Sequence, residues 1–162
     1  MRLGLAILPL LALSACGGER ERTPAEQRAE EDKAIAANEK PIPITPQPIL
    51  FPDIEKNDLF GASCAFVPDG GGVGAIFLAM DTMGAMKIDD EIVRFAPDRG
   101  SAELPMGIRS NFDGKAWSVT LAISGDGEQT GIETTTYKAA LTVRDAHEKI
   151  VYSANGSAQC GS

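Results

Sequence analysis

The chain has 162 residues, with 15 basic and 23 acidic side chains and a formal charge of −8. No run of lysine or arginine interrupts this acidic balance, so the composition argues against nucleic acid as a partner. Every aromatic residue lies at or after position 51. The 112 residues from there to the end are enough for one hydrophobic core and no more.

Residues 1–15 have the pattern of a signal peptide. Arg2 precedes an apolar run, Leu3 to Leu13, that contains no charged residue. This run has about the length of the hydrophobic region in a secretory signal. It is shorter than the roughly 20 residues of a membrane-spanning helix. A buried core helix of the same length is the alternative, and the position at the start of the chain favours the signal peptide.

The end of this segment, Leu13-Ser14-Ala15-Cys16, resembles the lipobox of bacterial lipoproteins. In that family the leader is cut before a cysteine that carries diacylglycerol, so the resemblance implies lipidation of Cys16. More than one acyl chain makes such an anchor stable. Gly17 stands where an aspartate would disfavour the outer membrane. The expected location is therefore the cell envelope, with the chain anchored to the periplasmic face of the outer membrane.

Residues 16–50 are expected to be a lipid-anchored linker. Thr23, Pro24 and Glu26 form the pattern of a helix N-terminus with a capping box, which predicts a helix over 24–39. Its apolar residues are mainly alanine and form no stripe, so we expect a solvated spacer. The proline-rich residues 41–48 are predicted to be extended, at about 3.1 Å per residue.

Residues 51–162 are predicted to form an all-β domain, a small antiparallel sandwich or barrel of seven or eight strands. Turn signals recur every 8–14 residues, and apolar and polar side chains alternate between them. A helical turn is expected over 53–60, and residues 125–131 read as a polar loop. The expected strands are one around Cys64 and the segments 73–80, 85–88, 91–95, 108–112, 115–124, 133–145 and 150–156.

The three cysteines divide into one plus two if Cys16 is acylated. Cys64 and Cys160 then remain near the two ends of the β domain. Export would place them in an oxidising compartment, where a disulfide is expected to join the first strand to the last. Two separate buried thiols are the alternative. Neither the spacing nor any histidine set predicts a zinc site.

We assign no catalytic, metal or cofactor site from the sequence. The glycine-rich residues 70–74 lack the spacing of a phosphate-binding loop and precede a strand pattern. His147, the single histidine, lies in a polar turn. Asp126, Glu128 and Glu133 invite a calcium interpretation but do not follow the EF-hand order. A solvated acidic loop fits them better.

These patterns predict a non-enzymatic, lipid-anchored protein whose β domain binds a protein or an envelope component. The domain carries 16 acidic and nine basic residues, a net charge of −7, which favours a basic partner electrostatically. One alternative is a carrier or sensor for a small apolar ligand inside a barrel. Another is similarity to bacterial lysozyme inhibitors in architecture and charge, although the loop at Ser124-Gly125 departs from theirs. An enzyme using His147 or the 126–133 loop is the third.

Overall fold

The computed structural model describes residues 22–38, 40–72 and 74–162. These residues belong to two compact units, one on each side of residue 39 in the sequence. In the first unit, α1 (Pro24–Asn38) begins at the predicted capping box. The N–H of Thr23 donates to Glu26 Oε2 (2.7 Å), and the N–H of Glu26 donates to Thr23 Oγ1 (3.3 Å). Both bonds satisfy donors that the first turn leaves free.

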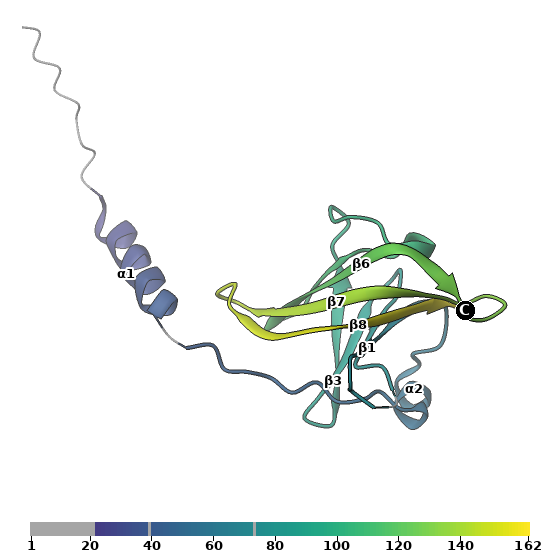
Figure 1. Cartoon of the computed structure of the whole chain (residues 1–162). Helices are drawn as coiled ribbons and strands as arrows, with labels where there is room; N and C mark the ends of the chain where they lie inside the picture. Colours follow the sequence, from purple (N-terminus) through teal and green to yellow (C-terminus); the bar gives the residue numbers. More distant parts are fainter. Residues whose placement is uncertain (1–21, 39, 73) are drawn as a thin grey trace, which may run out of the picture. The chain divides into compact units, whose positions relative to one another are not determined.

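The second unit is a closed barrel of eight antiparallel strands in sequential order, which confirms the all-β prediction and selects the barrel (Figure 1). β8 pairs with β1 and closes the sheet. The strands are β1 (Ser63–Pro68), β2 (Phe77–Ala79), β3 (Gly84–Ile88), β4 (Glu91–Pro97), β5 (Asn111–Asp113), β6 (Trp117–Gln129), β7 (Thr135–Asp145) and β8 (Ile150–Gly161). A 3-10 turn, η1 (Pro105–Gly107), lies between β4 and β5.

Side chains fill the barrel. Eight strands leave an interior that is just wide enough for side chains. Four phenylalanine rings are almost completely buried there, and Phe77 makes edge-to-face contacts with two of the others. The largest buried side chains of this core are Phe66, Phe77, Met86, Phe95, Ile108, Phe112, Val119, Leu121, Leu141 and Val143.

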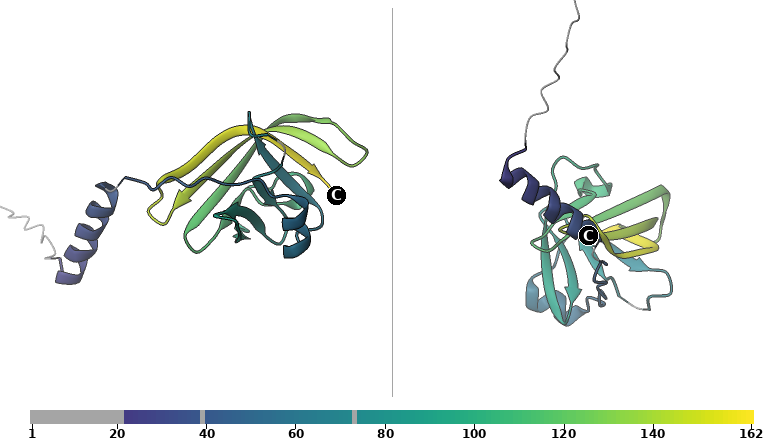
Figure 2. Two further views of the ribbon diagram at one scale, coloured as in Figure 1. Left: turned by 90° about the horizontal axis from the view of Figure 1, so that it is seen from below. Right: turned by 90° about the vertical axis from the view of Figure 1, so that its left-hand side faces the viewer.

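A second apolar cluster lies outside the barrel, beneath residues 40–50 and α2 (Phe51–Asn57). The N–H of Ile44 donates to Val151 O (3.1 Å), and Ile49 forms a bridge with Ala75. Figures 1 and 2 show this segment running along the outside of the barrel to α2, at the end where the C-terminus lies. Ile49 is 5% exposed. Residues 44–49 and α2 therefore pack on the barrel.

The start of α2 is fixed by one carboxylate. The N–H of Leu50 donates to Asp53 Oδ2 (2.9 Å), and Lys87 Nζ on β3 donates to Asp53 Oδ1 (3.0 Å). These interactions, the Leu50 hydrogen bond first, lower the pKa of Asp53. The helix covers residues 51–57 rather than 53–60, because Asp58 adopts a left-handed conformation (φ 52°) that ends it.

Candidate functional site

The three longest strands carry an open groove on their solvent-facing side. A hollow of about 480 Å³ lies over β6, β7 and β8, and a second of about 510 Å³ adjoins it. Both hollows are lined by Asp69, Ser124, Lys138 and Gly156. The register places Ser124 opposite Lys138, and Lys138 opposite Ser157, so these three residues share one face of the sheet. We call the two hollows together the β6–β8 groove.

A β-bulge of three residues forms one wall of the groove. Ser124 pairs with Lys138 and Glu128 pairs with Thr136, so three residues of β6, Gly125 to Gly127, lie opposite Tyr137 alone. Both glycines have left-handed backbones (φ 79° and 75°). A Cβ on Gly127 would lie 2.5 Å from Tyr137 Cε1, so only glycine allows the tyrosine ring to lie against β6. The segment expected to be a polar loop over 125–131 is therefore mostly strand, with the hairpin tip at residues 130–134.

The side chains around the groove carry unbalanced charge. Asp69, Asp126 and Glu128 are exposed carboxylates that line it, and Lys138 is the cation in the same lining. Ser124 Oγ donates to the backbone carbonyl of Lys138 (3.4 Å), which joins β6 to β7 at this point. The surface is thus net negative and exposes hydroxyl and carboxylate groups to solvent.

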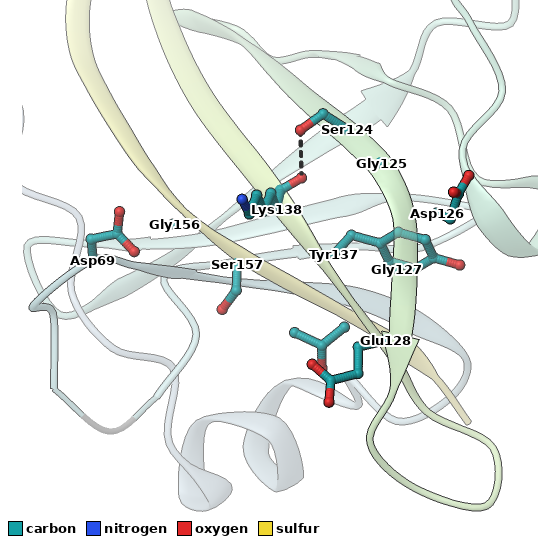
Figure 3. Close-up of a pocket in the computed structure, with 11 residues that line it drawn as sticks. Asp69, Ser124, Gly125, Asp126, Gly127, Glu128, Tyr137, Lys138, Gly156 and Ser157 are labelled. Carbon is teal, nitrogen blue, oxygen red and sulfur yellow. Dashed lines mark hydrogen bonds between the residues drawn. The ribbon is translucent and has the colours of Figure 1, made fainter.

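The carboxylates stand apart around the rim. Figure 3 shows Asp69 beyond Gly156 on one side, Asp126 on the other, and Glu128 away from both, with Lys138 and Tyr137 between them. Across residues 22–38, 40–72 and 74–162, no three His, Cys, Asp or Glu side chains converge as metal ligands. The three carboxylates therefore stand as separate charges around the groove.

The residues singled out in the sequence do not form one centre. Cys16 lies outside the described residues. Cys64 and Cys160 are joined by a disulfide at paired positions of β1 and β8. His147 is exposed in the β7–β8 turn, whereas Glu133 lies at the opposite end of β7 and accepts a hydrogen bond from Ser162 Oγ. At about 3.3 Å per residue, the length of β7 separates these two ends by roughly 33 Å.

The β7–β8 turn is organised by an aspartate rather than by the histidine. The N–H of Lys149 donates to Asp145 Oδ1 (2.9 Å), and the N–H of His147 donates to the same oxygen (2.8 Å). The hydrogen bond from Lys149, followed by the one from His147, lowers the pKa of Asp145. The structure thus gives His147 an exposed position in a turn that Asp145 organises.

The sequence analysis missed the bulge and the role of Tyr137. The signal was present: two glycines flank Asp126, and polar residues that pair across β6 and β7 follow on both sides. Alternating left-handed glycines inside a long strand pattern indicate a bulge as readily as a loop.

Comparison of the chain with models of known protein families, with curated proteins and with solved structures gave no match. Among the helices that the structure describes, none has the length and apolar character needed to cross a membrane.

Proposed function

We propose that this chain is a lipid-anchored protein of the bacterial cell envelope whose barrel binds a protein or another envelope component without catalysing a reaction. The observation that carries the proposal is the contrast between the barrel's filled interior and the open, charged β6–β8 groove on its surface. The lipobox-like segment before Cys16 supports the anchor. The disulfide supports an oxidising compartment.

The charge of the groove favours a ligand with basic groups. Three carboxylates and one lysine line it, within a domain whose net charge is −7. A cationic surface would gain from this field in the rate of encounter and in orientation. The filled interior favours surface binding over transport of a small apolar molecule inside the barrel.

Cross-linking in intact cells tests the binding function, with the chain recovered through a tag after Ser162. Replacing Asp126 and Glu128 with lysine should reduce the recovered partner strongly, because the groove would change from net negative to net positive. The matched control is the double variant Asp113→Lys with Glu91→Lys, which makes the same charge change at exposed positions of β5 and β4 outside the groove. Equal recovery from the groove variant and the control would contradict binding at this surface.

The anchor is tested separately by mass spectrometry of the membrane-extracted protein. The expected chain begins at Cys16 and carries added acyl mass. An intact Met1 terminus, or an unmodified soluble chain, would contradict lipidation.

A second candidate, inhibition of a basic enzyme such as lysozyme, is favoured by the negative groove alone. Ser124 and Gly125, the residues nearest to the inhibitors' loop in sequence, lie in the bulge at this groove. A lysis assay with purified lysozyme and the purified barrel tests it. Unchanged lysis at a molar excess of the barrel would remove this candidate and leave the binding function in place.

A further inference from the structure

Apolar side chains gather in the open at the end of the barrel where α2 lies. Phe51 is 63% exposed and Phe60 is 57% exposed, and their rings meet edge to face with centroids 6.4 Å apart. Phe60 and Met106 line one hollow of about 220 Å³ above the buried Ile108. We call Leu50, Phe51, Phe60 and Met106 the apolar end. Contiguous exposed apolar residues with polar neighbours are typical of interaction surfaces.

Met106 is held there against its own backbone preference. Its φ of 66° lies in the left-handed region, which favours glycine or asparagine. The turn is fixed on both sides, because the N–H of Leu104 donates to Ile108 O (2.7 Å). Yet 46% of the Met106 surface stays exposed. Burial within the fold therefore compensates little for the backbone strain at Met106. Contact of its side chain with a partner would provide that compensation.

One acidic side chain lines the apolar end, and two more lie close to its residues in the chain. Asp81 lines the hollow with Phe60 and Met106. Glu55 and Asp58 are exposed on and just after α2, and Lys56 is the opposing charge between them. A second copy is a poor occupant, because an isologous interface would bring the same carboxylates face to face. An anionic membrane surface would be repelled for the same reason.

Residues 44–50 pack on the barrel and begin at the end opposite to the apolar end. Ile44 hydrogen-bonds to Val151 beside the β7–β8 turn, and the chain then runs along the barrel to Leu50. Six residue steps at about 3.3 Å each give roughly 20 Å of extended chain between these points. Residues 44–50 therefore run towards the apolar end along the barrel.

We propose that the apolar end docks a partner protein that presents an apolar side chain within a basic rim. This inference rests on the proposed function insofar as the barrel must face other envelope proteins. It adds a second surface to the β6–β8 groove and names the chemistry of its partner.

Photo-cross-linking of the full chain in its native cells tests the inference, with p-benzoyl-phenylalanine replacing Phe60. Ile150, which is 48% exposed beside the β7–β8 turn, is the control position for the same probe. We expect one protein adduct from position 60 and none of that mass from position 150. The adduct yield should fall at least about tenfold when Asp58 and Asp81 are both replaced by lysine. An adduct to a second copy, an adduct to lipid, no adduct, or a yield unchanged by the lysines would each overturn the inference.

The protein identified in that adduct then serves as the probe for a binding titration. Met106→Asn removes the apolar side chain while suiting the left-handed backbone, so the barrel should be at least as stable as the wild type. Its affinity should nevertheless fall at least about tenfold, in the range of interface hot spots. Ile150→Ser should bind like the wild type. Wild-type affinity for Met106→Asn, or a parallel loss of thermal stability and binding, would overturn the inference.

The results that would contradict the proposed function differ from those that would contradict docking at the apolar end. It depends on the acyl mass at Cys16 and on the response of the groove to Asp126→Lys and Glu128→Lys, and neither measurement involves the apolar end.

Discussion

Reduction of the Cys64–Cys160 disulfide is expected to remove a large part of the barrel's stability. The two cysteines are 96 positions apart and tie β1 to β8, the pair of strands that closes the sheet. In the chain-entropy model, the cross-link restricts the denatured chain. Removing a cross-link that closes a loop of this length therefore lowers the free energy of unfolding by about 4.7 kcal/mol at 25 °C. Single domains are usually stable by only about 5–15 kcal/mol.

Urea denaturation with and without a reductant measures this loss. With an m-value of about 2 kcal/mol per molar urea, a loss of about 4.7 kcal/mol lowers the midpoint by roughly 2 M. Cys64 is fully buried, so each sample must reach equilibrium through unfolding before it is read. The variant with both cysteines replaced by alanine is the control, and its midpoint should not respond to the reductant.

The reasoning would be refuted if the oxidised and reduced midpoints agreed within about 0.3 M. That result would mean that the denatured chain already holds its two ends together, so that the cross-link removes little freedom. A lower m-value for the oxidised protein would instead support the model, because a cross-linked denatured chain exposes less surface.

Three further perturbations test the parts of the barrel. Ile49→Ala should lower the free energy of unfolding, measured by urea denaturation, by about 3 kcal/mol. Ile42→Ala, at a residue that is 82% exposed, should change it by no more than about 0.5 kcal/mol. Equal losses from the two variants would contradict the packing of residues 40–50. The lowered pKa of Asp53 gives stability that is complete above about pH 4 and falls as the pH drops through the native pKa. Asp53→Asn should therefore show a weaker acid dependence of its unfolding free energy than the wild type, and parallel curves would argue against the role of this carboxylate. Gly127→Ala should lower the melting temperature more than Gly70→Ala, because both have left-handed backbones but only Gly127 meets a tyrosine ring; equal shifts would contradict the bulge.

The strands of the barrel could be predicted because the alternation of apolar and polar residues within each segment indicates a strand. In β6 and β7, Val119, Leu121, Leu141 and Val143 alternate with polar residues and are all buried. The turn at residues 89–90 was also readable: both aspartates have positive φ, as a two-residue hairpin requires. Sandwich and barrel share these local patterns, so the choice between them depends on the pairing of β1 with β8, which no local signal specifies.

The packing of residues 40–50 on the barrel could not be predicted from their composition. Residues 40–50 contain prolines and no aromatic residue, which is typical of a solvated linker. Ile44 packs against the main core of the barrel, and Ile49 packs on an apolar patch of the outer cluster. That patch exists because Leu78 and Ala85 point outwards from β2 and β3, and nothing near residues 40–50 in the sequence reveals it.

The packing of residues 40–50 and α2 on the barrel determines which parts of its outer surface remain open for binding. In β2 both faces are buried, since Phe77 and Ala79 point into the core while Leu78 lies beneath residues 40–50 and α2. The outer face of β6, β7 and β8 carries no such cover over the β6–β8 groove, and the small side chains Ala122, Ser124 and Ala140 leave that groove open. α2 covers the outer apolar cluster, while Phe51 on α2 and Phe60 just after it stay exposed. A segment that only sealed the outer cluster would need Ile49 and Ile54 but not an exposed Phe51. The exposed pair of Phe51 and Phe60 is therefore the feature of this segment that the stability of the barrel does not explain.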